Sequence, residues 1–113
     1  MAITKLKLSG STDGRMVKVA ATGSAGTTLH TAHSTNLDEV WLWAVNSSIN
    51  PVKLTVEFGG TSSPDDLIEV TIAPEGGLQL LVPGLVVTGS VVIAAFAGTA
   101  NVINIAGYVN RIS

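Results

Sequence analysis

An all-β fold, a single-domain antiparallel β-sandwich of about eight strands with a jelly-roll-like arrangement, is predicted by three features of the sequence. Clusters of turn-forming residues recur every ~8–12 residues, a spacing typical of sandwiches and barrels. Between them lie short runs in which β-branched and aromatic residues alternate with polar ones, the pattern of half-buried strands. No segment shows a convincing helical pattern. The 113 residues form one domain, residues 1–113, which is long enough for one real core.

The expected strands are separated by segments rich in Gly, Ser, Thr, Asn, Asp and Pro, which are the main turn formers. The first strand carries two lysines and suits a sheet edge, where Lys discourages further pairing. We expect strands at residues 3–8, 16–21, 27–32, 40–45, 53–58, 67–72, 78–82, 90–97 and 102–109.

Segment 38–60 is the predicted centre of the core, because it contains both tryptophans and two strongly apolar runs. A polar turn cluster at 46–51 separates strand 40–45 from strand 53–58. Two strands joined by a short polar connection are typical of a β-hairpin, which we predict here. The apolar face of the second strand consists of Leu54, Val56 and Phe58, with polar residues on the other face.

Strand 40–45 is apolar on both faces, as are the runs 91–96 and 102–106. A sandwich strand has one core face and one outer face, so an apolar outer face needs a second cover. Loops, a terminal strand or another subunit could provide it. Residues two apart share a face, so either Val40, Leu42 and Ala44 point inward, or the opposite set does. We therefore identify Trp41, Trp43 and Val45 as candidate packing or subunit-interface residues, between sheets or between subunits.

Trp41 and Trp43 have a second interpretation, since two aromatic rings on one strand face can form a platform that stacks on sugars. Carbohydrate-binding β-sandwich modules use such platforms. Val45 continues the same face without a polar group to orient a sugar. Aromatic residues dominate cores and interfaces, so packing is the favoured interpretation and a carbohydrate-binding module the alternative.

Composition favours an assembly protein over a nucleic-acid or membrane partner. Charged residues make up 12% of the chain, about half the usual ~25%, and a weakly charged, apolar surface often indicates assembly. Net charge is −2, and the six basic residues form no run that could follow a phosphate backbone. No apolar run approaches the ~20 residues of a membrane helix. The N-terminal residues lack a signal-peptide core, so we expect synthesis in a cytoplasm.

We expect no enzyme activity, no cofactor and no metal. His30 and His33 have a spacing that sends their side chains to opposite faces of a strand, without a third metal ligand nearby. Asp65 and Asp66 supply too few oxygens for calcium, which takes about six to eight. The chain has no cysteine and no G-x-S-x-G nucleophile motif.

Three stretches resemble a family of small virion structural proteins of tailed phages. They are ITKLKLSGSTDGR at 3–15, DEVWLWAVNSS at 38–48 followed by VKLTVEFGGTSSPDDLIEVTI at 52–72, and NVINIAGYVNRIS at 101–113. The most specific parts are Phe58–Ile68 and Gly107–Ile112. Some members of this family are similar to capsid cement, or head-decoration, proteins. No catalytic motif carries over from the family.

The resemblance implies a homotrimer that binds the outer surface of the assembled head, at junctions between copies of the major capsid protein. It implies localisation on the virion after synthesis in the host cytoplasm. Another virion role, such as a head-fibre base or a tail protein, is a further alternative.

Overall fold

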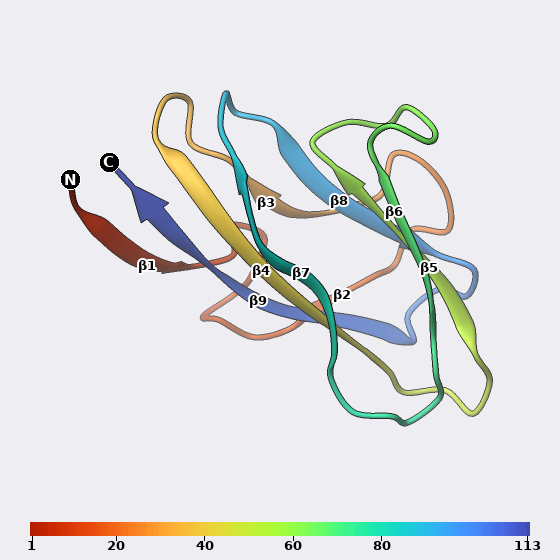
Figure 1. Cartoon of the computed structure of the whole chain (residues 1–113). Helices are drawn as coiled ribbons and strands as arrows, with labels where there is room; N and C mark the ends of the chain where they lie inside the picture. Colours follow the sequence, from red (N-terminus) through yellow and green to blue (C-terminus); the bar gives the residue numbers. More distant parts are fainter.

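The computed structural model describes all 113 residues, which form nine β-strands and no helix, as predicted for an all-β protein (Figure 1). The strands are β1 (Ile3–Lys7), β2 (Val17–Lys18), β3 (Thr27–Thr31), β4 (Leu37–Asn46), β5 (Val52–Phe58), β6 (Leu67–Ile72), β7 (Gln79–Val87), β8 (Val92–Ala97) and β9 (Ile103–Ile112). The structure contains no helix of the length and hydropathy needed to span a membrane.

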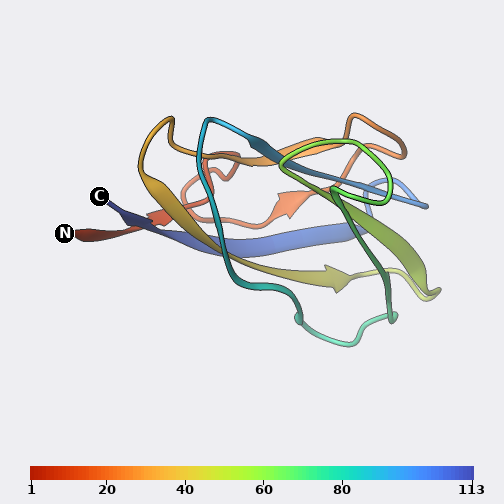
Figure 2. The ribbon, with the colours of Figure 1, turned by 45° about the horizontal axis from the view of Figure 1, so that its top comes forward.

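The strands form two antiparallel sheets that pack face to face (Figure 2). Sheet A has the order β1-β9-β4-β7, with β2 also paired to β9, and sheet B has the order β3-β8-β5-β6. Apart from β1–β2 and β5–β6, each strand is followed by a strand of the other sheet. This is the strand order of a jelly roll, a sandwich of two Greek keys. The predicted sandwich is confirmed, and its topology is that of a jelly roll.

The predicted hairpin at 38–60 is wrong, because β4 and β5 lie in different sheets. β4 stays paired to β9 up to its last residue, Asn46. The buried Asn46 side chain then fixes the crossing, since its Nδ2 donates to the carbonyl oxygens of Asn50 and Ile72 at 2.8 and 3.0 Å. Two successive strands bury alternate residues whether they pair in one sheet or lie in opposite sheets. The alternation alone therefore does not distinguish a hairpin from a connection between sheets.

The core lies between the sheets and consists mainly of aliphatic side chains. β4 contributes Val40, Leu42 and Ala44, and β5 contributes Leu54 and Val56 from the opposite sheet, all fully buried. Phe58 is partly buried and packs against this cluster. The inward face of β4 is therefore the aliphatic one, and the tryptophans lie outside.

The polar side of β5 is covered rather than open to solvent. Thr55 and Glu57 are only 3% and 2% exposed, although they point away from the core. The segment that connects β2 to β3 crosses this side, where Ser24 Oγ donates to Glu57 and the carbonyl of Ala21 accepts from Ala97 N. Sheet B thus has a cover of its own over part of its outer face.

Among the outer strands of sheet A, β1 agrees with the sequence prediction, whereas β2 and β7 differ from it in length. β1 pairs only with β9, as expected of an edge strand, and Ile3 lies opposite Ile112, so the chain ends are neighbours (Figure 1). β2 is shorter than the predicted strand 16–21. β7 runs without a break through Pro83, with two irregularities in its register to β4. An edge strand tolerates proline because its outer backbone groups need no partner.

Candidate functional site

The outer face of sheet A carries a cluster of three aromatic side chains. β4 alternates along its length, so Trp41, Trp43 and Val45 point away from the core and are partly exposed. Tyr108 of β9 lies directly opposite Trp41 in the register of the two strands. We call the surface around these rings the aromatic face and define it as Lys5, Glu39, Trp41, Trp43, Leu80, Val86, Tyr108 and Asn110.

The three rings are close to one another and nearly parallel. The ring centroids of Trp41 lie 6.2 Å from those of both Trp43 and Tyr108, and the remaining pair is 6.0 Å apart. The interplanar angles are between 12° and 24°. Each such pair is worth roughly 0.5–1.5 kcal/mol beyond the burial of its area. The rings therefore hold one another in a fixed arrangement before any partner arrives.

Polar groups at the rim orient these rings. Glu39 Oε1 accepts a hydrogen bond from Trp41 Nε1 at 2.7 Å and another from Asn110 Nδ2 at 3.1 Å. The hydrogen bond from Trp41, and then that from Asn110, lowers the pKa of Glu39 below its ordinary value. On the other side, Lys5 Nζ lies 4.6 Å from the centroid of the Tyr108 ring, in a cation–π contact.

β7 extends the aromatic face to the edge of sheet A. Gly84 has φ +77°, and a Cβ atom there would lie 2.8 Å from Cζ2 of Trp41, so the indole packs where only glycine leaves room. Leu80 and Val86 lie opposite Trp43 and Glu39 and are 48% and 49% exposed. β7 pairs with β4 alone, so its outer backbone edge is unpaired.

Of the sequence-predicted residues, Trp41 and Trp43 pack against each other, and Val45 lies on the same outward side of β4. This side faces away from the core and is not between the sheets. Sequence reasoning missed Tyr108 and Lys5, which complete the cluster. Their positions depend on the pairing of β4 and β1 with β9, and this long-range register has no local signal. The alternation within 102–109 indicates only which residues of β9 share a face with Tyr108.

A second cluster, also missed, is buried at one end of the sandwich. His30 Nε2 is 2.8 Å from Asp38 Oδ2, and Arg111 donates to both oxygens of the same carboxylate, at 2.8 and 2.9 Å. Ser9 N donates to His30 Nδ1 at 3.0 Å, which leaves the ring proton on Nε2, where it donates to Asp38. His30 and Asp38 are 1% and 0% exposed. A substrate has no access to them, so the cluster is structural.

Opposing effects act on the ionisation of Asp38. Burial raises the pKa of this carboxyl, but hydrogen bonds from Arg111 and His30, the positive charge of Arg111 and the amide of His33 lower it. Together they leave the pKa lowered from 3.8 to about 2. The hydrogen bonds that Arg111 donates to Asp38 raise the pKa of Arg111 in turn. Asp38 is therefore a carboxylate at neutral pH.

The residues considered as metal ligands make other contacts. His33 Nδ1 accepts from the amides of Thr35 and Asn36 at 3.0 and 2.9 Å, closing a turn. Asp66 Oδ2 accepts from the amide of Ser62 at 3.1 Å. No group of three or more His, Asp or Glu side chains is placed to hold a metal ion.

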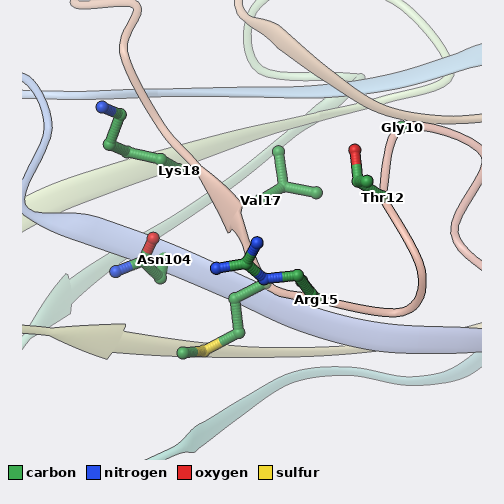
Figure 3. A pocket seen from close by; sticks show the side chains of 7 residues that line it. Gly10, Thr12, Arg15, Val17, Lys18 and Asn104 are labelled. Carbon is green, nitrogen blue, oxygen red and sulfur yellow. The ribbon is translucent and has the colours of Figure 1, made fainter.

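One open cavity, of about 430 Å³, lies beside β2 at the edge of sheet A. Figure 3 shows its lining side chains, among them Arg15, Lys18 and Asn104. Arg15 and Lys18 are exposed and form no ion pair within the chain. Two exposed cations do not define a ligand, so the aromatic face remains the best-formed candidate site.

Comparison of the chain with protein-family models, with curated proteins and with solved structures gave no match.

Proposed function

We propose that this chain is a capsid cement protein of a tailed phage, which binds the outer surface of the assembled head through its aromatic face. The observation that carries the proposal is the cluster of three mutually packed rings on an outer sheet face, beside exposed aliphatic residues and a free strand edge. The resemblance of Phe58–Ile68 and Gly107–Ile112 to a virion protein family supplies the identity of the partner, the major capsid protein.

The physical properties of the aromatic face suit a stable protein contact. Tryptophan, tyrosine and arginine are enriched among residues that dominate interface energetics. Trp41 is held by Glu39 and by its neighbouring rings, so little side-chain entropy is lost on binding. Leu80 and Val86 add apolar area that is now in contact with water.

A cement protein needs no chemistry, because it acts by binding. A protein that binds only the assembled lattice stabilises it by RT ln(1 + [L]/Kd) per site, which is about 2.7 kcal/mol at a concentration of a hundred times Kd. Many copies on one head convert this modest gain into a large collective resistance to internal pressure. Trimerisation would place several aromatic faces around one capsid junction and add avidity.

The proposal is tested by locating the protein on purified virions by cryo-electron microscopy and by measuring its binding to isolated heads. We expect density on the outside of the head, with sheet A toward the capsid. Density confined to the tail, or no density on the head, would overturn the proposal.

Variants connect the location to the aromatic face. We expect Trp43→Ala and Leu80→Ala to weaken head binding at least tenfold, because both truncate exposed apolar groups of this face. Ile49→Ala is the matched control, since Ile49 is a large exposed aliphatic residue in the β4–β5 connection, away from the face. Equal effects of Leu80→Ala and Ile49→Ala would exclude the aromatic face as the contact surface.

A second candidate function, carbohydrate binding, is favoured by the near-parallel orientation of the three partly exposed rings. Glu39, Asn110 and Lys5 provide the polar groups that the sequence alone did not place beside the tryptophans. Titration with cellohexaose and with chitohexaose tests this function through tryptophan fluorescence. Saturable quenching that is lost in Trp43→Ala would support it, and unchanged fluorescence with both would refute it for β-glucan and chitin-type chains.

A further inference from the structure

Glu57 is a buried carboxylate without a cationic partner. It lies on the outward side of β5, is 2% exposed, and takes part in none of the ion pairs of the chain. Its Oε2 accepts from Ser24 Oγ at 2.6 Å, and its Oε1 accepts from Gly26 N at 2.7 Å. A buried charge is costly unless it is paired as well as hydrogen-bonded. Two neutral donors satisfy about half of the roughly four acceptor sites of a carboxylate.

A cavity of about 420 Å³ opens beside this carboxylate. Its walls come from segment 25–28, from segment 59–61 after β5, and from the outward side of β8. The lining side chains are small or absent, as at Gly26, Gly59 and Gly60, and Glu57 is the only ionisable residue among them. The volume is many times the ~30 Å³ that one water occupies, so it accommodates a side chain.

We propose that this cavity receives a lysine or arginine side chain from a partner protein, whose ammonium or guanidinium group pairs with Glu57. The pocket offers one negative charge and no positive one, so its charge is complementary to a cation. The carboxylate of Asp66 lies beside Gly60, one of the lining residues, and adds a second negative charge close to the cavity. Charge-assisted bonds from a cation would fill the remaining acceptor sites of Glu57.

This inference goes beyond the proposed function and does not depend on it. The cavity belongs to sheet B, whereas the aromatic face belongs to sheet A. A cement protein with both features would contact one neighbour through each sheet. Loss of head binding in Trp43→Ala would leave the occupancy of this cavity unchanged, so the two proposals fail separately.

The first test is an NMR titration of the ¹⁵N-labelled chain with ethylguanidinium, well below denaturing concentrations. The neutral isostere N-ethylurea at matched ionic strength is the control. We expect saturable shifts at the amides of Gly26, Gly59, Gly60 and Thr61 with the cation alone. In Glu57→Gln, binding should weaken about tenfold or more, as for loss of a charge-assisted hydrogen bond. Equal shifts with both compounds, or none at these amides, would overturn the proposal.

Glu57→Gln also weakens the hydrogen bonds that Ser24 and Gly26, in the segment covering sheet B, donate to residue 57. A second pair of variants therefore leaves Glu57 in place. Thr61 is an exposed residue that lines the cavity. We expect Thr61→Arg to supply the cation from within the chain, to raise Tm by several degrees and to abolish binding of ethylguanidinium. Thr61→Gln, long but neutral, should do neither. Equal behaviour of the two variants would contradict the proposal.

The source of the cation is identified by light scattering in the same titration. A drop in solution mass as ethylguanidinium binds supports a second copy of this chain as the partner. An unchanged mass, with binding still observed at Gly59 and Gly60, supports a different protein.

Discussion

His30 Nε2 of sheet B and Asp38 Oδ2 of sheet A lie 2.8 Å apart inside the sandwich. Arg111 reaches the same carboxylate from β9, so one group connects three strands across both sheets. The backbone pairing of the strands joins neighbours within each sheet and does not pair a strand of one sheet with a strand of the other. This polar cluster therefore supplies a directional contact between the sheets, in addition to the non-directional burial of the aliphatic core.

Asp38→Ala is expected to destabilise the fold strongly. It leaves His30 without an acceptor and Arg111 without a counter-charge, and breaking a buried pair from one side costs about 3–5 kcal/mol. Urea unfolding followed by tryptophan fluorescence measures the change in the free energy of unfolding. Lys53→Ala is the control, because it removes an exposed ion pair with Glu69, worth about 0–1 kcal/mol. A similar small loss for both variants would contradict the structural role of Asp38.

The stability of the protein should fall in acid because of the same carboxyl. The pKa of Asp38 is about 2 in the folded chain against 3.8 ordinarily, so its contribution is fully present above about pH 4 and is lost as pH falls toward 2. At 1.36 kcal/mol per pKa unit, the contribution is about 2 kcal/mol. Other carboxyl groups titrate too, so the difference between the wild type and Asp38→Asn isolates it. We expect the two curves of unfolding free energy against pH to converge toward pH 2, and parallel curves would refute the assignment.

The local pattern of residues predicts much of the fold. The errors of that prediction concern which strands pair over long distances in the sequence. Alternation in 40–45 and 53–58 locates β4 and β5 correctly, because each strand buries one face. It does not determine which strands pair, so the same pattern predicts a hairpin where the chain crosses between two sheets. The controlling residue is Asn46, whose side chain bonds to Ile72 in a strand 26 residues away.

In the candidate site too, local alternation predicts some residues, whereas long-range strand pairing places others that the sequence does not reveal. Local alternation places Trp41, Trp43 and Val45 on one face, and the structure shows that this face is outward. Tyr108 lies 67 residues after Trp41 in the sequence, and only the pairing of β9 with β4 brings it beside the tryptophans. Likewise, no local pattern links Asp38 to its partners His30 and Arg111, which lie in other strands. Clusters formed by register are not visible in a single sequence.

Gly84→Ala should disturb the aromatic face selectively. Alanine at φ +77° is strained, and its Cβ would lie 2.8 Å from the Trp41 ring, which must then move. Gly77→Ala is the matched control, because Gly77 has nearly the same φ, +76°, with nothing near its Cβ position. We expect Gly77→Ala to cost about 1–2 kcal/mol and Gly84→Ala about 1–3 kcal/mol more. Near-ultraviolet circular dichroism should change only in Gly84→Ala, and unchanged tryptophan signals there would contradict the packing of Trp41 on Gly84.

Gly107→Ala should disrupt the centre of sheet A. Gly107 lies opposite Leu42 in the β9–β4 pairing, and a Cβ atom at this position would overlap the backbone oxygen of Trp41. A backbone oxygen within a strand cannot move aside without breaking the pairing that positions Tyr108 beside the tryptophans. We expect a loss of at least about 3 kcal/mol, measured by urea unfolding, or failure to fold. Gly23→Ala, at a position with open space and no positive φ, should stay within about 0.5 kcal/mol of the wild type. A Gly107→Ala protein as stable as Gly23→Ala would be incompatible with this register of β4 and β9.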